Sequence, residues 1–328
     1  MAREDVRAGL PAMLAAVHDE LTGVAEGRVA SYIPELACAD PNWFGIAVAT
    51  TDGVVFECGD SAQPFTIQSV SKPFVYGLAL EMHGRDRVLE RIGVEPSGES
   101  FNSIILDERS NRPFNPMINS GAIVTADLIE GPDFAARSSR MIDMLSRYAS
   151  HRLGVDDAVF ASERTTGHRN RAIAHLMSSF GMLSDKLEET LELYFQQCSV
   201  LVTCRDLAVM GATLANWGVN PLSGQRAVEA PYVKDILSMM LSCGMYDYSG
   251  EWAYRVGLPA KSGVGGGIVA VVPGQGAIAT FSPPLDEKGN SVRGIRAIEK
   301  LADHYGLHFL ESVFRGNTLG SAMRVETD

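Results

Sequence analysis

Strand-like sequence lies near both ends of this chain of 328 residues, and a long helical stretch separates the two groups. The strand-like runs are short and rich in β-branched and apolar residues. They cover residues 44–50, 54–58, 259–263, 267–272 and 277–282. The pair Asp52-Gly53 joins the first two runs and supplies the positive φ that a tight hairpin requires. We therefore predict one sheet assembled from both ends of the sequence, mainly antiparallel because hairpin-length loops join its strands.

Apolar residues recur at helical spacing before, between and after these runs. The segments with this pattern cover residues 4–24, 69–83, 134–153, 170–180, 187–198, 205–217, 232–243 and 292–305. The order of elements predicts an α/β fold: an α/β/α layer covered by the terminal helices, with an all-helical cluster made from the middle of the chain. We place a discontinuous sheet domain at residues 1–84 and 246–328 and a helical domain at 85–245. A cleft is expected where the two meet.

Charge and cysteine content exclude several classes of protein. Twenty-eight Lys and Arg against 40 Asp and Glu give a net charge of −12, and no predicted face gathers the basic residues that nucleic acid requires. The apolar runs are far shorter than the roughly 18 residues of a membrane helix, and residues 1–21 lack the apolar core of a secretory signal. Five scattered cysteines without a C-x-x-C pair predict reduced thiols in the cytoplasm, and neither a disulfide framework nor a structural zinc site.

One serine and one lysine have the spacing of a nucleophile and its base. Lys72 is the only one of the six lysines with a serine, Ser69, three positions before it. On a helix the two side chains share a face, so the amine could accept the serine proton. Pro73 is tolerated only in the first turn of a helix, which places Ser69 at or just before the helix start. Unpaired N–H groups there could stabilise an oxyanion, whereas Ser71 points elsewhere and is the poorer nucleophile.

The S-x-x-K pair alone fits a capping serine and a surface lysine equally well. A second motif, Lys261-Ser262-Gly263, opens a late strand-like run. In serine β-lactamases and penicillin-binding proteins, S-x-x-K is combined with a K-T-G strand and with an S-D-N motif. The S-D-N motif is absent here, the nearest sequence being Ser184-Asp185-Lys186. The architecture therefore fits those enzymes, while the penicillin-type substrate site does not.

Further motifs resemble the glutaminase family of serine-dependent enzymes, which share the β-lactamase-like fold. They are Tyr32-Ile33-Pro34-Glu35-Leu36-Ala37, the stretch from Gln68 to Pro73, Glu95-Pro96-Ser97-Gly98, Asn115-Pro116-Met117-Ile118-Asn119-Ser120-Gly121-Ala122-Ile123, Ser162-Glu163-Arg164, Gly167-His168-Arg169-Asn170, Tyr194-Phe195-Gln196-Gln197-Cys198-Ser199, Cys243-Gly244-Met245-Tyr246-Asp247, the stretch from Gly257 to Val264, and Ser282-Pro283-Pro284-Leu285-Asp286. The resemblance spans roughly residues 25–305. It implies hydrolysis of L-glutamine to L-glutamate and ammonia by a bacterial-type enzyme.

The resemblance also implies roles for particular residues. Ser69 is expected to be the nucleophile and Lys72 its base, and Tyr246 is expected to take part in proton transfer at the serine. Backbone N–H groups of Ser69 and Val264 are expected to form the oxyanion hole. The remaining positions, which hold the amino acid, are Tyr32, Asn119, Glu163, Asn170 and Tyr194.

Chemistry agrees with the positions that hold the amino acid. Glu163 suits the α-ammonium of glutamine, and Asn119, Asn170 and Tyr194 can donate to its carboxylate. Taken alone, Glu163 would fit a solvated helix end, Tyr194 a core residue and Asn119 a helix cap. His168 stands where family members often have Asp, and we interpret it as loop variation.

No cofactor or metal is expected, because no His, Asp and Glu residues have metal-ligand spacing, and no histidine occupies a recognised catalytic motif. We expect L-glutamine as the small-molecule partner, and a homodimer or homotetramer, as the resemblance implies. Two other functions are considered: a β-lactam-recognising serine hydrolase, and an inactive glutamine-binding sensor. Intact Ser69, Lys72 and Tyr246 argue against the sensor.

Overall fold

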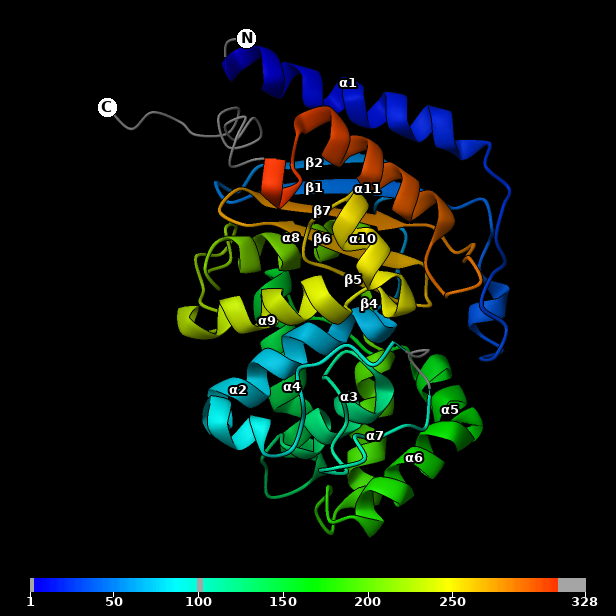
Figure 1. The fold of residues 1–328 in the computed structure, drawn as a ribbon. Coiled ribbons are helices and arrows are strands. Elements are labelled where there is room, and N and C mark those ends of the chain that lie inside the picture. Colours follow the sequence, from blue (N-terminus) through cyan, green and yellow to red (C-terminus); the bar gives the residue numbers. More distant parts are fainter. Residues whose placement is uncertain (1–2, 99–102, 312–328) are drawn as a thin grey trace.

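The computed structural model describes residues 3–98 and 103–311 (Figure 1). Its helices are α1 (Arg3–Thr22), α2 (Lys72–Leu89), α3 (Asn119–Asp127), α4 (Phe134–Ala149), α5 (Asp157–Thr166), α6 (His168–Ser179), α7 (Leu187–Cys198), α8 (Cys204–Ala215), α9 (Ala230–Cys243), α10 (Ser249–Arg255) and α11 (Val292–Tyr305). Its strands are β1 (Gly45–Thr50), β2 (Val55–Gly59), β3 (Phe65–Thr66), β4 (Leu201–Val202), β5 (Ala260–Ser262), β6 (Gly267–Val272) and β7 (Gly276–Phe281). Short 3₁₀ helices lie at η1 (Leu36–Cys38), η2 (Gln68–Ser71) and η3 (Tyr246–Tyr248).

The main sheet joins the two ends of the sequence, as predicted. Its strand order is β2-β1-β7-β6-β5, and every neighbouring pair is antiparallel. The predicted hairpin is present, with Ile46 opposite Cys58. On its other side β1 pairs with β7, where Ile46 lies opposite Thr280. The mainly antiparallel sheet is therefore confirmed.

Both faces of the sheet are buried, and alternate residues of each strand point to opposite faces. On one face Ile46 and Val48 share a core with α1, α10 and α11. On the other face Ala47 and Ala49 belong to the core that contains α8. A Cβ on Gly211 of α8 would lie 2.6 Å from the Cβ of Ala277, so small residues let this helix approach the strands closely. The α/β/α layer is confirmed. In Figure 1 the sheet has α1 and α11 on one side and α8 on the other.

Helices α3 to α7 form the predicted all-helical cluster below this layer (Figure 1). Helix α8 falls within residues 85–245 but packs on β1, β6 and β7, and a single hydrophobic core joins it to α2, α4 and α7. The division into domains at residues 84 and 245 therefore stays a prediction. Residues 1–2 and 312–328 of the predicted sheet domain lie outside the described residues, as do residues 99–102 of the predicted helical domain.

Two local details differ from the sequence expectation. The helix expected to stop at Gly84 continues to Leu89 as α2, with a kink at Gly84, where φ is 74° and ψ 168°. Strands β3 and β4 were not predicted, because two-residue strands carry no periodic pattern. They place Val202 opposite Phe65, and the Ile67 N–H donates to the Val200 carbonyl at 2.8 Å. This pairing fixes the segment that leads into Ser69.

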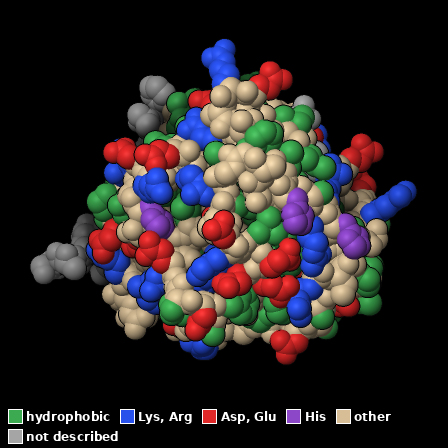
Figure 2. All heavy atoms as spheres, turned by 90° about the horizontal axis from the view of Figure 1, so that it is seen from below, with side chains coloured by type: hydrophobic (Ala, Val, Ile, Leu, Met, Phe, Trp, Pro, Cys, Tyr) green, Lys and Arg blue, Asp and Glu red, His purple; other side chains and the backbone are tan. Residues whose placement is uncertain are grey.

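The surface below the helical cluster is mixed in charge. Figure 2 shows Lys and Arg interleaved with Asp and Glu over this face. Within the described ranges, no helix is both long and apolar enough to cross a membrane.

Candidate active site

Ser69 lies at the junction that the sequence predicts. It belongs to η2, and α2 begins three residues later at Lys72 with Pro73 in its first turn. The preceding residue, Gln68, has a positive φ of 48°, which turns the chain sharply before the serine. Ser71 is fully buried, where its hydroxyl donates to the Gln68 carbonyl at 2.7 Å and accepts from Gln197. The hydrogen bonds of Ser71 thus stabilise the turn, whereas Ser69 lines the adjacent cavity.

That cavity measures about 300 Å³ and contains most of the predicted substrate-binding residues. It is lined by Tyr32, Ile33, Gln68, Ser69, Asn119, Glu163, Thr166, Gly167, Arg169, Asn170, Tyr194 and Cys198. The structure therefore brings together residues from the loop before η1, from η2 and from α3, α5, α6 and α7. Lys72, Tyr246 and Val264 do not line it and lie around Ser69 instead.

Lys72 is buried directly behind the cavity. Its Nζ donates to the Asn119 side-chain oxygen at 2.7 Å and to the Met117 carbonyl at 3.3 Å. Burial lowers the pKa of the amine to about 8, although the nearby Cys198 and Glu163 favour the charged form. An amine with this pKa loses its proton at mildly alkaline pH.

The Tyr246 hydroxyl accepts a hydrogen bond from the Ser69 hydroxyl. The same Tyr246 hydroxyl donates to the Ser262 carbonyl at 3.0 Å, so the Ser69 O–H is the donor between the two hydroxyls. Burial raises the pKa of Tyr246, and the bond from Ser69 opposes that shift. The proton of Ser69 thus points to Tyr246, whereas S-x-x-K spacing alone suggests Lys72.

Glu163 is a buried carboxylate at the wall of the cavity. It lies on α5, and the carboxylate of the N-cap residue Asp156 accepts from the Ala158 and Val159 N–H groups. Burial raises the pKa of Glu163 to about 7, while a hydrogen bond from Gln68 and the charge of Lys72 favour the ionised form. Glu163 is 5% exposed, so a cation that enters the cavity would meet an incompletely neutralised negative group.

Asn119 connects Lys72 with the cavity. It is the first residue of α3, and Ile118 takes the cap position that the sequence suggested for Asn119. Its side-chain oxygen accepts from Lys72, and its Nδ2 donates to the Asn170 side-chain oxygen at 3.0 Å. Each of these amide oxygens accepts one hydrogen bond, and both amides keep N–H groups that can donate to an anion.

Tyr194 and Cys198 lie one turn apart on α7 and contact each other through a hydrogen bond between hydroxyl and thiol. Both are buried, and burial raises the pKa of each. Tyr32 completes the mouth: the residue is 55% exposed, and burial and the charge of Glu163 raise its pKa. Tyr32 and Tyr194 thus both line the cavity, and their roles in binding stay predictions.

Val264 follows strand β5, which packs against η2. A Cβ on Gly263 would lie 2.9 Å from Val70 Cγ2 and 3.1 Å from the Ile67 carbonyl oxygen, so only glycine fits at this contact. The close approach keeps the backbone of residues 263–264 next to the segment that carries Ser69. The expected oxyanion donors therefore lie on two adjacent segments.

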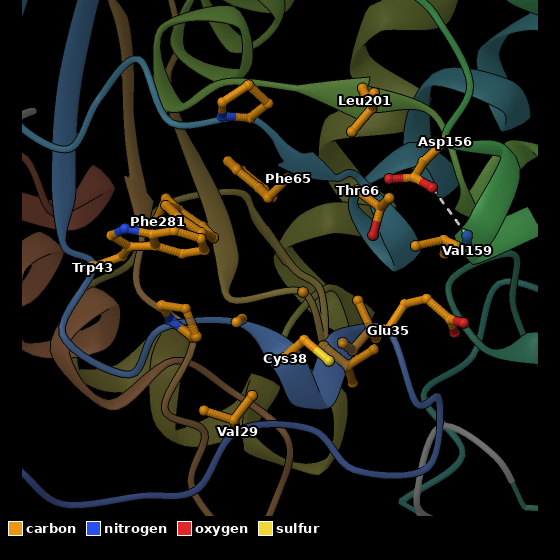
Figure 3. A pocket seen from close by; sticks show the side chains of 16 residues that line it. Val29, Glu35, Cys38, Trp43, Phe65, Thr66, Asp156, Val159, Leu201 and Phe281 are labelled. Atoms are coloured by element: carbon orange, nitrogen blue, oxygen red, sulfur yellow. Dashed lines mark hydrogen bonds between the residues drawn. The ribbon is translucent and has the colours of Figure 1, made fainter. Parts of the chain in front are cut away.

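Figure 3 shows a second cavity, of about 180 Å³, which Val264 helps to line. Trp43, Phe65 and Phe281 form an apolar wall, and the rings of Phe65 and Phe281 stack with centroids 4.0 Å apart. Ser69, Lys72, Tyr246 and Glu163 are not among its lining residues. The candidate active site is thus the cavity that contains Ser69.

Several residues near the site were not predicted to act there. Gln68, Arg169 and Cys198 line the cavity, and Lys261 is fully buried next to Tyr246. Cys198 follows Tyr194 at i+4 spacing, a signal that could have identified it. His168 is exposed and is not a lining residue. No group of three or more metal-ligating side chains occurs among residues 3–98 and 103–311.

Comparison with known proteins gives a consistent result. The sequence model of the glutaminase family matches residues 27–310. A glutaminase of Microcystis aeruginosa is 60% identical over 89% of this chain and 86% of its own length. A glutaminase of Trichormus variabilis is 61% identical over 90% of this chain and 89% of its own.

Solved structures have the same fold. A probable glutaminase, ybaS, superposes with a TM-score of 0.90 and 42% identity, and the match covers 94% of this chain and 99% of that one. A structure of Mglu in its glutamate form gives a TM-score of 0.89 and 44% identity over 95% of this chain and 71% of that one. With its mainly antiparallel sheet, its helical cluster and these matches, the chain belongs to the glutaminase family and has that family's β-lactamase-like fold.

Proposed function

We propose that this chain hydrolyses L-glutamine to L-glutamate and ammonia through an acyl-enzyme on Ser69. The observation that carries the proposal is a cavity with a buried carboxylate, beside which Ser69 is hydrogen-bonded to Tyr246 and Lys72 to Asn119. The curated relatives named as glutaminases support the reaction. The Mglu structure in its glutamate form supports a site that accommodates the product.

Binding is proposed to fix the α-carbon end of glutamine first. Glu163 pairs with the α-ammonium, while N–H groups of Asn119 and Asn170 and the Tyr194 hydroxyl donate to the α-carboxylate. Tyr32 covers the mouth. The side-chain amide then extends to Ser69, and the Ser69 and Val264 N–H groups receive its carbonyl oxygen.

In the first half-reaction the Ser69 hydroxyl, which donates to Tyr246 in the free protein, turns toward Lys72 once the substrate is bound. The Ser69 oxygen then forms a bond to the amide carbon, and Lys72 accepts the serine proton. A neutral amine has two N–H groups and one lone pair. Because Asn119 and Met117 provide acceptors for two N–H groups, the lone pair is available as the base. Tyr246 donates a proton to the nitrogen as the C–N bond breaks, ammonia leaves, and the proton on Lys72 restores Tyr246.

In the second half-reaction water attacks the ester carbon. Its proton passes to the same basic groups, the bond to the Ser69 oxygen breaks, and the serine recovers a proton as glutamate forms. Each cycle consumes one glutamine and one water and releases one glutamate and one ammonia, so no redox partner is needed.

The direct test is a side-by-side assay of purified protein with L-glutamine, L-asparagine and a chromogenic β-lactam. We expect ammonia and glutamate from glutamine in equal amounts and negligible β-lactam turnover. Rapid β-lactam hydrolysis without ammonia from glutamine would support the β-lactam hydrolase instead. Tight glutamine binding without turnover would support the inactive sensor.

We also propose a homodimer or homotetramer that acts in the cytoplasm, as the family resemblance implies. Light scattering of the purified chain tests the assembly, and cell fractionation tests the compartment.

A further inference from the structure

Arg169 lines the candidate active site, and the proposed reaction gives it no role. In the described part of the chain, Arg169 and Glu163 are the charged side chains among the lining residues. Their surroundings differ, because Glu163 is buried whereas Arg169 is exposed. Tyr32, at the mouth of the cavity, is exposed as well. The positive group therefore lies at the mouth, and the negative group lies deeper in the cavity.

The first turn of α6 positions Arg169. Arg169 is the second residue of this helix, directly after His168. The N-cap residue Gly167 packs so closely that a Cβ there would lie 2.6 Å from the Glu163 carbonyl oxygen and 2.6 Å from Phe195 Cζ. Its N–H also donates to the Glu163 carbonyl at 2.9 Å. The backbone at Arg169 is thus fixed against α5 and α7, and the positive end of the helix dipole has the same sign as the guanidinium.

The charges of bound glutamine do not balance within the groups proposed so far. Glu163 pairs with the α-ammonium. The α-carboxylate receives only neutral donors, from Asn119, Asn170 and Tyr194. Lys72 must be neutral to act as a base, so it supplies no positive charge. One negative charge in a partly buried site is then left without a counter-charge, which weakens binding.

Two other arginines lie close to Arg169 in the sequence, and both have contacts elsewhere. The Arg164 Nε lies 2.7 Å from a carboxylate oxygen of Glu192. The Arg171 guanidinium lies over the Phe195 ring, 5.2 Å from its centroid. Neither arginine lines the cavity. Of the three, Arg169 is the one placed to act on a bound amino acid.

We propose that Arg169 is a specificity-determining residue, whose guanidinium attracts and retains the α-carboxylate of the substrate at the mouth of the cavity. Glu163 and Arg169 then form two opposite poles, which select a zwitterionic α-amino acid over amides that lack either charge. Because Arg169 is exposed, water and salt screen its charge, so the effect on affinity is modest. Because it acts at the α-carbon end, it affects binding and not the step that breaks the amide bond. This inference rests on the proposed function.

The first test is the steady-state kinetics of glutamate formation from L-glutamine. In Arg169→Met, KM should rise about 3- to 10-fold while kcat stays within about twofold of wild type. Arg169→Lys keeps the charge and should recover most of the loss in KM. Raising NaCl from about 20 mM to about 500 mM should increase KM more in wild type than in Arg169→Met. An unchanged KM in Arg169→Met, or a fall in kcat alone, would overturn the proposal.

The second test uses L-glutaminamide, in which a neutral carboxamide replaces the α-carboxylate. Its inhibition constant is measured on glutamate formation from L-glutamine, because hydrolysis of its own side-chain amide yields no glutamate. This constant should differ by less than about twofold between wild type and Arg169→Met, since the inhibitor has no charge for the arginine to attract. An increase as large as that of KM for glutamine would indicate a structural change of the pocket and would contradict the proposal.

Arg171→Met is the matched control. It removes the same charge two residues further along α6, from a side chain that does not line the cavity. Its KM and kcat should match wild type within about twofold. Circular dichroism checks that each variant is folded. Wild-type protein that forms no glutamate contradicts the proposed function, whereas active wild-type protein with an unmoved KM in Arg169→Met contradicts only the role of Arg169.

Discussion

Lys72 and Glu163 are both held in surroundings that oppose their ordinary charge. Burial lowers the pKa of Lys72 to about 8 and raises that of Glu163 to about 7. Lys72 must be neutral to act as a base, and Glu163 must be ionised to bind an ammonium. Both requirements are met only as the pH rises. The residues thus predict an enzyme of neutral to alkaline pH.

The pH dependence of kcat/KM tests whether Lys72 must be neutral for catalysis. We expect kcat/KM to rise with pH through about 8 and then to level off, because the base is protonated below its pKa. Lys72→Arg keeps the positive charge but cannot release its proton in this range, so it should lose at least about 100-fold in kcat. Near wild-type turnover in the Arg variant would contradict general-base catalysis by Lys72.

Glu163 links binding with stability. Glu163→Gln should raise KM for glutamine at least about 30-fold, because the α-ammonium loses its buried charge partner. The raised pKa of Glu163 stabilises the folded state below the unfolded value, near 4.5, and this contribution is lost as pH rises through about 7.

The variant does not lose that contribution. The free energy of unfolding of the variant, relative to that of wild type, should therefore increase by roughly 1–3 kcal/mol from about pH 5 to about pH 8. Urea unfolding at both pH values measures the difference. Parallel pH dependence of the two proteins would show that Glu163 is not destabilised by burial.

At the scale of elements, the site depends on how closely β5 approaches η2. The contact between Gly263 and Val70 leaves no room for a side chain, and Gly244 lets α9 end directly against the Ala260 carbonyl. This packing positions Lys261 on β5 and the turn after β5 that carries Val264. Catalysis should therefore be sensitive to a displacement of β5.

Gly263→Ala tests the packing of these elements. The added methyl group should push β5 from η2 by a few tenths of an ångström or more, and we expect kcat to fall on the order of 100-fold while KM changes little. Gly154→Ala is the control, since a Cβ there would meet no atom within 4 Å. Unchanged kcat in Gly263→Ala would argue against an oxyanion hole at residues 263–264.

At the scale of the whole molecule, the sequence predicts elements better than contacts. Strong apolar periodicity predicts α7 and α11 with their bounds, and Asp52-Gly53 predicts the hairpin. The motifs predict which side chains gather around Ser69. The position of α8 on the sheet, the positive φ of Gln68 and the burial of Lys261 depend on packing between distant segments, which no local pattern encodes. The family resemblance predicts that Tyr246 acts at the serine, but not that Ser69 is the donor of the hydrogen bond between them.

The cavity lies between the helical cluster and the sheet, and we expect it to select substrates by their length. The groups proposed for the α-carbon end belong to helices of the cluster, whereas Ser69 lies where the cluster meets the sheet. Asparagine is one methylene shorter, and its carbonyl should miss the oxyanion donors by about 1 Å, which can cost on the order of 100-fold in rate. Ammonia assays with both amino acids measure the ratio. Equal kcat/KM values would keep the amidase chemistry but contradict this account of the pocket.

The central claim is that Ser69 becomes acylated. Mass spectrometry of peptides after inactivation by a glutamine analogue with an electrophilic ketone in place of the amide tests it most directly. We predict one adduct, on the peptide that contains Ser69, with fragmentation placing it on Ser69, and protection by excess L-glutamate. An adduct on Ser71, or equal labelling of Ser69→Ala, would contradict the account.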